Sequence, residues 1–316
     1  MSGAGLNIVI LGRDGQIAWE LQRRLPDLGR VTVIGRPEID LSRPDSLRRA
    51  IRELSPDVLV NASAYTAVDQ AENEPELALA LNATAPQVLA EEARRINALF
   101  VTYSSDYVFD GTKAAPYTEE DLGHPLNVYG RSKLAGDQAV QAVGGDNLIL
   151  RTSWVYGARG KNFLRTISAL ALQRDEIRVV DDQVGAPTSS YDIAQATAQI
   201  VAGLRHRSGR IAALGKRSGI YNMTSQGAVS WCGFATAILD QMRDRGLKQA
   251  LARIVPIPSK EYPTPAERPR NSRLSNAKLQ AEFGIALRDW RQALAATMEM
   301  LDLPARDGCS VGPGGR

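Results

Sequence analysis

The feature that most constrains the fold of this chain is the alternation of short apolar runs with longer amphipathic segments over its first 151 residues. The apolar runs are nearly continuous, which is typical of strands in a parallel sheet that helices cover on both faces. We expect strands at 7–11, 31–34, 58–61, 99–104 and 147–150, and helices at 17–25, 44–54, 76–96 and 132–143. This repeated β-α-β order predicts an α/β fold built on a doubly wound parallel sheet of the Rossmann type.

The regular alternation loosens after residue 151. Helices are expected at 162–172, 191–204, 231–245 and 290–303, and strands at 177–180 and 220–222. The segment 255–273 carries five prolines and is interpreted as an extended loop. We therefore assign residues 1–151 mainly to the Rossmann domain, to which later segments return. Residues 152–303 are assigned mainly to a smaller interleaved α/β domain, and residues 304–316, rich in glycine and proline, are predicted to be disordered.

Composition narrows the classes of function. The net charge of +3 is too small to indicate nucleic acid or an anionic membrane as a partner. His124 and His206 are the only histidines, which excludes a His-rich metal site, and neither lies in a motif for Ser-His-Asp hydrolysis. Cys232 and Cys309 form no disulfide framework, and no apolar run approaches the roughly 20 residues that span a bilayer. We expect a cytoplasmic protein that binds neither nucleic acid nor membrane.

The first expected strand runs into a glycine-rich turn at 12–18, and a helix follows. Gly12 and Gly15 allow a tight turn in which the backbone can approach a diphosphate, and the helix start offers unpaired N–H groups. The spacing G-x-x-G-x-x-A differs from the usual G-x-G-x-x-G, but Ala18 still permits close packing of helix on strand. A dinucleotide site is the interpretation, and a plain glycine-rich turn is the alternative.

The second and third expected strands also end in residues suited to a dinucleotide. Arg36 stands where NAD-preferring sheets usually carry an acid for the ribose 2′-hydroxyl. It could meet the 2′-phosphate of NADP or point to water, while Asp40 and Leu41 could flank the adenine. The small-residue run 61–66 suits a backbone lying against the cofactor, with an ordinary strand-to-loop turn as the alternative. We expect dual use of NADPH and NADH.

Tyr129 and Lys133 stand four residues apart at an expected helix start, which places them on one helical face. A tyrosine has an ordinary pKa of about 10. A nearby ammonium favours the phenolate, so Lys133 is expected to lower the pKa of Tyr129 and also to hold the cofactor ribose. Ser105, at the end of the fourth strand, can hydrogen-bond a substrate carbonyl; a capping role in the following turn is its alternative. These three residues are the predicted catalytic set.

Together, these motifs resemble those of the dTDP-4-dehydrorhamnose reductase family of extended short-chain dehydrogenases. The resemblance is carried by LG-x-x-GQ at 11–16, NASAYTAVDQAE at 61–72, YSSDYVFDG at 103–111, PLNVYG-x-SKLAG at 125–136, RTSWVY at 151–156, DQ-x-GAPT at 182–188 and RP-x-NSRL at 268–274. It covers nearly the whole chain, from residue 7 to about 303. The resemblance implies NAD(P)H-dependent reduction of the C4 ketone of dTDP-4-dehydro-β-L-rhamnose to dTDP-L-rhamnose.

The resemblance also implies roles for individual residues. Gly15, Gln16 and Ile17 would face the cofactor diphosphate, and Asp40, Leu41, Ala64, Tyr65, Thr66 and Tyr103 would line the rest of the cofactor site. Ser105, Asp106 and Trp154 would meet the sugar nucleotide. Arg273 is the candidate for the substrate diphosphate because its fork of donors matches two oxygens, with Arg268 and Arg270 nearby.

Some points stay open on the sequence alone. The family often has threonine at the place of Ser105, which keeps the hydroxyl. A divalent metal at a dimer contact is described for some relatives, but we find no convincing acidic cluster, so the metal and a homodimer stay open. A nucleotide-sugar dehydratase or epimerase is one alternative, although Asp106 is followed by Tyr107 rather than a second acid. A non-catalytic NADP-binding regulatory subunit is the other.

Overall fold

The computed structural model describes residues 5–206, 210–246 and 251–301. Cys309 and the predicted disordered tail at 304–316 lie outside these residues. The main sheet has six strands, all parallel, in the order β10-β5-β4-β3-β1-β2. Their bounds are β1 Leu6–Leu11, β2 Gly29–Ile34, β3 Val58–Asn61, β4 Leu99–Ser105, β5 Asn147–Thr152 and β10 Gly219–Asn222. The predicted doubly wound parallel sheet is confirmed.

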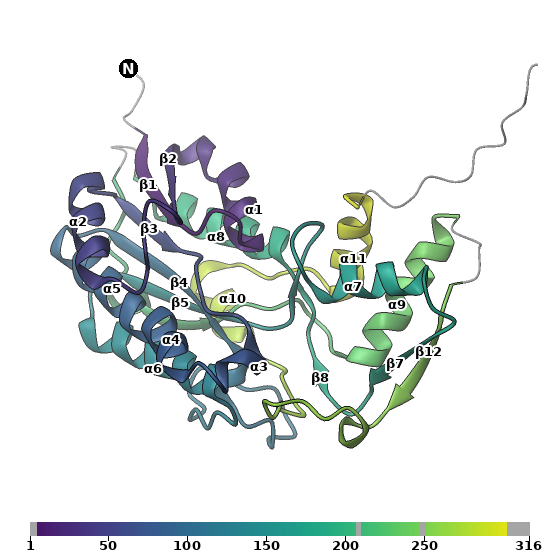
Figure 1. Cartoon of the computed structure of the whole chain (residues 1–316). Coiled ribbons are helices and arrows are strands. Elements are labelled where there is room, and N and C mark those ends of the chain that lie inside the picture. The colour runs from purple at the N-terminus through teal and green to yellow at the C-terminus, as the bar shows by residue number, and fades with distance from the viewer. Residues whose placement is uncertain (1–4, 207–209, 247–250, 302–316) are drawn as a thin grey trace, which may run out of the picture.

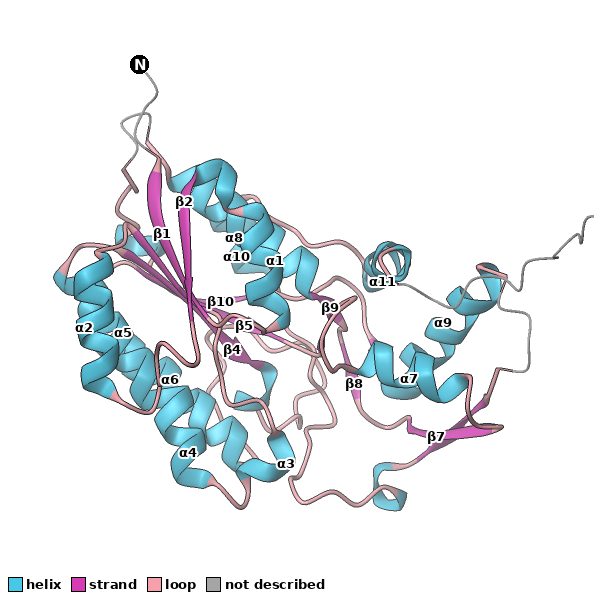
Figure 2. Cartoon of the chain, turned by 45° about the horizontal axis from the view of Figure 1, so that its top comes forward, coloured by secondary structure: helices cyan, strands magenta, loops and turns pink. Residues whose placement is uncertain are grey.

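Helices cover both faces of this sheet, as Figure 2 shows. One face packs against α1 (Gln16–Arg24), α8 (Ser190–Leu204) and α10 (Ala277–Phe283), and the other against α2 (Pro44–Leu54), α5 (Ala85–Arg95) and α6 (Val128–Val143). In β1, Ile8 and Ile10 face the first core while Val9 and Leu11 face the second, because successive side chains of a strand alternate between faces. Two buried faces therefore explain the continuous apolar runs in the sequence.

The prediction of a single helix at 76–96 is wrong in detail. The structure has α4 (Pro75–Leu79), a π-helical turn (Ala80–Thr84) and then α5. Pro86 has no N–H to donate to the carbonyl of Asn82, so an α-helical ladder cannot run through this point. The turn buries Asn82, whose side chain accepts from the Tyr65 N–H at 2.9 Å and donates to the Tyr65 carbonyl at 3.0 Å. Asn82 thereby holds in place the loop that follows β3.

A second region lies beside the Rossmann part (Figure 1). Its helices are α7 (Phe163–Ala171), α9 (Trp231–Asp244) and α11 (Trp290–Glu299), and its parallel strand pair is β7 (Glu176–Val180) and β12 (Arg253–Ile257). Four short strands complete it: β6 (Val155–Tyr156) pairs with β9 (Thr188–Ser189), and β8 (Val184–Gly185) with β11 (Val229–Ser230). Between these elements the chain returns to the main sheet through α8, β10 and α10.

The expected extended loop at 255–273 is partly wrong, because its first residues belong to β12. Strand β12 pairs with β7 alone in its two-stranded sheet, so Pro256 can lie in it without removing a hydrogen bond from a second neighbour. The sequence also did not reveal α3 (Val68–Ala71), a single helical turn next to the loop after β3.

Among the described residues, we find no helix with the length and apolar character needed to cross a membrane.

Helix α6 passes so close to the π-helical turn that Gly136 leaves no room for a side chain. A Cβ at this position would lie 2.0 Å from the carbonyl oxygen of Asn82. We predict that Gly136→Ala lowers the free energy of unfolding by about 1–3 kcal/mol, since the helix or the turn must shift. Urea denaturation measures this change.

Gly203→Ala is the matched control, because a Cβ there would meet no atom within 4 Å. Gly203 lies inside α8, where alanine stabilises a helix by up to about 1 kcal/mol relative to glycine. Equal unfolding midpoints for the two variants would contradict the close contact between α6 and the turn.

Candidate active site

A cavity of about 690 Å³ opens at the carboxyl ends of β1, β3 and β4, where parallel sheets of this type bind their ligands. Twelve residues predicted to bind the cofactor line it: Gly12, Gly15, Gln16, Ile17, Arg36, Leu41, Ala64, Tyr65, Thr66, Tyr103, Tyr129 and Lys133. They come from positions spread over more than a hundred residues of sequence. The fold therefore gathers the proposed cofactor residues around one cavity.

The glycine turn after β1 passes close to the loop after β3 and leaves the start of α1 open to the cavity. Gly12 has φ +106°, and a Cβ there would lie 2.8 Å from the Ser63 hydroxyl oxygen, so the position suits glycine alone. Gly15 is the N-cap of α1, and no side chain of the described residues caps this helix. The first N–H groups of α1 are thus available to an anion at the cavity wall.

Asp40 is the exception among the predicted cofactor residues. Its carboxylate lies outside the cavity lining and accepts hydrogen bonds from the Ser42 N–H at 2.9 Å and the Ser42 hydroxyl at 2.7 Å. These bonds hold the pKa of Asp40 below its usual range. Asp40 therefore shapes its own turn, and we do not retain it as a cofactor ligand; its neighbour Leu41 lines the cavity.

Helix α6, which carries Tyr129 and Lys133, begins at Val128, four residues earlier than expected, so Tyr129 lies in its first turn. Asn127 caps the helix by accepting from the Gly130 N–H at 2.7 Å, and the Glu72 carboxylate accepts from the Val128 N–H at 2.8 Å. A Cβ at Gly130 would lie 2.2 Å from the carbonyl oxygen of Tyr107. The cap and this close contact fix the position from which Tyr129 projects.

Two of the three predicted catalytic residues, Tyr129 and Lys133, line the main cavity, and Ser105 lies just outside its lining, next to Tyr129. Ser105 is buried at the end of β4, and its hydroxyl interacts with that of Tyr129. The Lys133 ammonium donates to the backbone carbonyl of Tyr103 at 2.6 Å. The Ser105 hydroxyl also donates to Asp106 at 3.1 Å, and burial raises the pKa of Asp106 to about 6.

The expected lowering of the Tyr129 pKa by Lys133 is wrong for this structure. Burial raises the pKa of Tyr129 to about 12, and the hydrogen bond with Ser105 opposes that rise. Lys133 directs its ammonium to a carbonyl oxygen, and its own pKa is lowered by burial to about 8. At neutral pH Tyr129 is therefore protonated, as a group that donates a proton must be.

The residues predicted to meet the sugar nucleotide lie outside the lining of the main cavity. Trp154 has φ +48° and stacks on Trp231, with ring centroids 3.5 Å apart and planes 8° apart. A Cβ on Gly185 would lie 2.5 Å from the Trp154 ring, so only glycine leaves room for the indole. Trp231 in turn lines a second cavity of about 370 Å³.

This second cavity also has a charged wall. The Arg268 guanidinium donates to both carboxylate oxygens of Asp69, at 3.0 and 2.7 Å. Asp69 belongs to α3, next to the loop that lines the main cavity. The pair therefore joins the Rossmann part to the segment that follows β12.

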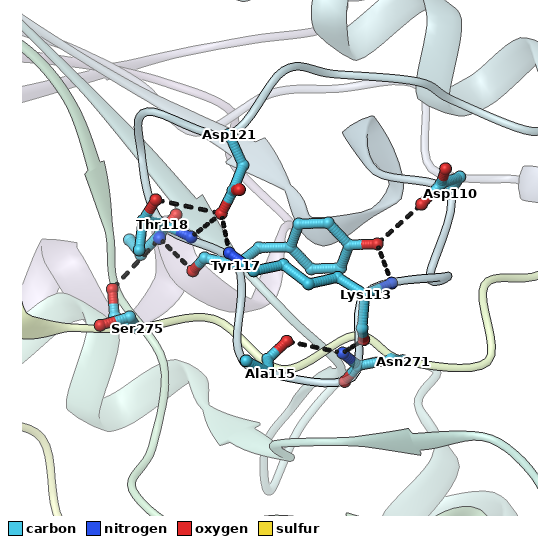
Figure 3. A network of polar contacts seen from close by, with 9 residues as sticks. Asp110, Lys113, Ala115, Tyr117, Thr118, Asp121, Asn271 and Ser275 are labelled. Atoms are coloured by element: carbon cyan, nitrogen blue, oxygen red, sulfur yellow. Dashed lines mark hydrogen bonds and ion pairs between the residues drawn. The ribbon is translucent and has the colours of Figure 1, made fainter.

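Arg273 lies away from both cavities, contrary to its predicted place at the substrate diphosphate. Its Nε donates to Asn271 at 2.8 Å, and its guanidinium also donates to the Ala114 carbonyl. Figure 3 shows the Asn271 amide donating to the carbonyls of Lys113, at 2.6 Å, and Ala115, at 3.0 Å. Arg273 thus fastens one loop to another, and Arg268 is the arginine that lines a cavity.

The sequence did not reveal Lys161 and Gly160, which line the main cavity from the loop after β6. The Asn162 amide, next in the chain, donates to the Gln16 side chain at 2.9 Å and so holds this loop against α1. No motif marks these residues, because only the folded chain brings position 162 to position 16. Within the described ranges, we find no group of three acidic, histidine or cysteine side chains arranged to hold a metal.

One cavity is lined by a glycine turn and a Tyr-x-x-x-Lys helix at the edge of a parallel doubly wound sheet, and a strand-end serine lies next to the tyrosine. This arrangement defines a nicotinamide-dependent oxidoreductase of the extended short-chain dehydrogenase type. The sequence model described as the RmlD substrate binding domain matches residues 6–303. The chain belongs to the dTDP-4-dehydrorhamnose reductase family. The predicted resemblance, and with it the oxidoreductase class and the NAD(P) cofactor, is confirmed.

Individual relatives agree with this assignment. The chain is 50% identical over 292 residues to a dTDP-4-dehydrorhamnose reductase of Burkholderia thailandensis, covering 92% of this chain and 97% of that protein. A reductase of the same name from Escherichia coli K12 is 40% identical, covering 90% and 95%. A solved reductase from Bacillus anthracis in complex with NADP has a TM-score of 0.84 at 29% identity and covers 93% of this chain and 99% of that one.

The charge on Lys133 should limit activity at high pH. Lys133 has a pKa of about 8 and loses its positive charge as pH rises through that value, whereas Tyr129 stays protonated up to about 12. We predict that kcat/KM, which reports the free enzyme, falls above about pH 8. A profile of reductase activity from pH 6 to 10 measures this, and circular dichroism at each pH controls for unfolding. A flat profile to pH 10 would show that the charge on Lys133 is not needed.

Proposed function

We propose that this chain reduces the C4 ketone of dTDP-4-dehydro-β-L-rhamnose to dTDP-L-rhamnose, with NADPH or NADH as the hydride donor. The observation that carries the proposal is that Tyr129 and Lys133 line the same cavity as the glycine turn before α1, with Ser105 next to Tyr129. Family membership supplies the substrate class.

The chain's own residues divide the chemistry between them. When bound, the nicotinamide supplies a hydride to C4 of the sugar. Ser105 holds the carbonyl oxygen, and Tyr129 donates its proton to that oxygen, so the ketone gains a hydride and a proton and becomes an alcohol. Lys133 stabilises the phenolate left on Tyr129 and binds the cofactor ribose. A protonated Tyr129 suits reduction, because this direction requires an acid.

The cofactor residues and the substrate residues belong to different parts of the chain in this proposal. Residues 1–151 mainly bind NAD(P), and residues 152–303 mainly bind the sugar nucleotide. The second cavity supports this division, since most of its lining lies beyond residue 152. Arg268 is the proposed contact for the substrate diphosphate in place of Arg273, and Asp106 and Trp154 are retained as sugar contacts.

The proposal also covers the cellular location, the partners and the oligomeric state of the enzyme. A cytoplasmic location fits a small-molecule nucleotide-sugar substrate, and neither nucleic acid nor membrane is a proposed partner. A homodimer is proposed, and size-exclusion chromatography with light scattering tests it. The proposal does not include a divalent metal.

The reaction itself is tested by NADPH oxidation with freshly made dTDP-4-dehydro-L-rhamnose and identification of the product. We predict that Tyr129→Phe binds cofactor normally but loses about 100- to 10,000-fold in kcat, because only the proton donor is removed. Tyr221→Phe is the matched control: Tyr221 is buried in β10, donates to the Arg217 carbonyl and lines neither cavity.

Each outcome has a distinct meaning. Near-normal kcat in Tyr129→Phe would remove Tyr129 from the mechanism. An epimerised or dehydrated product would favour the alternative enzymes on this scaffold. Cofactor binding without any turnover of the keto-sugar would favour a regulatory subunit.

Arg36 is proposed to contact the 2′-phosphate that distinguishes NADPH from NADH. It lines the main cavity just beyond β2. We predict that Arg36→Ala lowers the kcat/KM ratio of NADPH to NADH by about 10-fold or more, the value of one charge-assisted hydrogen bond. Arg43→Ala is the control, since Arg43 is exposed, pairs with Asp40 and does not line the cavity. An unchanged ratio in Arg36→Ala would make Arg36 a plain surface charge.

A further inference from the structure

Behind the catalytic pair lies a cluster of buried charges that the proposed mechanism leaves without a role. Lys133, Asp137 and Arg151 are only 6%, 3% and 3% exposed. Asp137 follows Lys133 by one turn of α6, on the same helical face. Burying charged groups is costly, so a cluster placed beside an active site calls for an explanation.

The geometry of the cluster is specific. Arg151 Nε donates to Asp137 Oδ2 at 2.9 Å. Arg151 lies on β5 directly opposite Ser104 of β4, one residue before catalytic Ser105. Its guanidinium carbon also lies 5.2 Å from the centroid of the Phe109 ring, and its Nη1 is buried without a hydrogen-bond partner among the described residues. The ion pair thus joins the catalytic helix to the sheet beside the catalytic serine.

The charges of the cluster do not cancel. Lys133 and Arg151 carry two positive charges, and Asp137 carries one negative charge. The other titratable groups facing this part of α6 are Tyr129 on the same helix, and Asp106 and Tyr107 on the turn after β4. Within the cluster one positive charge is therefore left over, and above about pH 6 the Asp106 carboxylate is the second negative charge that faces it.

The Asp137 carboxylate, which Lys133 and Arg151 share, has to meet two opposing requirements. A buried ammonium without a counter-ion tends to lose its proton, since burial favours the neutral form. A carboxylate committed to Lys133 alone would instead cancel the charge that the Tyr129 phenolate needs. Asp137 also acts to raise the pKa of Tyr129. Arg151 takes up part of the Asp137 charge, so that Lys133 keeps its proton while the carboxylate opposes the Tyr129 phenolate less.

We propose that Asp137, held and partly neutralised by Arg151, is a positioning residue that keeps Lys133 protonated for proton transfer by Tyr129. This proposal rests on the roles given above to Tyr129 and Lys133. The attraction of Asp137 acts to raise the pKa of Lys133, against the larger lowering caused by burial. Neither Asp137 nor Arg151 lines the main cavity, so both act through Lys133 rather than on the substrate.

The first test is Asp137→Asn, which keeps the shape of the side chain and removes its charge. Loss of a nearby opposite charge lowers the pKa of an ammonium by on the order of 1 unit. The fall in kcat/KM at high pH should therefore begin about 1 unit lower than in the parent, while activity near pH 6 is reduced least. Asp137→Glu restores the charge and should restore the profile.

The second test is Arg151→Gln, which leaves Asp137 to act on Lys133 alone. The fall at high pH should then move upward, while the plateau value of kcat decreases because the phenolate is less stabilised. Opposite shifts in the two variants distinguish this electrostatic role from damage to the fold, which would lower activity at all pH values alike.

The pH dependence of the NADPH Kd, followed by nucleotide fluorescence, gives a readout that does not need turnover. Lys133 holds the ribose in this proposal, so its loss of charge should weaken binding, at lower pH in Asp137→Asn and at higher pH in Arg151→Gln. If the parent fails to reduce the keto-sugar, the proposed function fails while the Kd profiles still decide this inference. If either variant does not fold, the other decides. Profiles that coincide with the parent in the folded variants would overturn the proposal.

Discussion

The site depends above all on how helix α6 is seated against the sheet. Two glycines on its inner surface, Gly130 and Gly136, bring the helix against the carbonyls of Tyr107 and Asn82, where any Cβ would overlap them. Asn127 and Glu72 then satisfy the first N–H groups of the helix. Because side chains project from a helix in fixed directions, this seating aims Tyr129 and Lys133 at the end of β4. A substitution that shifts α6 would therefore displace Tyr129 and Lys133 even if it left both residues unchanged.

The electrostatics of the site suit a reductase. A tyrosine whose pKa lies above its ordinary value remains an acid throughout the neutral range, and a ketone being reduced needs an acid beside its oxygen. Burial thus keeps Tyr129 in the protonated form that a proton donor needs.

Among the polar contacts that connect the Rossmann part to the second region, two lie at or next to the main cavity. Asn162 holds the loop after β6 against Gln16 at the start of α1, and Arg268 clasps Asp69 beside the loop after β3. Each contact joins a residue at the main cavity, or close to it, to a segment of the second region.

The sequence by itself determined the alternation of strands and helices in the Rossmann part and the placing of Tyr129 and Lys133 on one helical face, since apolar runs, a glycine turn and a four-residue Tyr–Lys spacing are local patterns that physical chemistry constrains. Its motifs also revealed the family. It could not reveal that Asp40 turns to Ser42, that Arg273 fastens a loop while Arg268 lines a cavity, or that Lys161 reaches the cofactor site. Those outcomes depend on which distant backbone groups lie within hydrogen-bonding reach. The pKa of Tyr129 was likewise decided by tertiary structure, because burial is a property of the packed chain and not of the Tyr–Lys spacing.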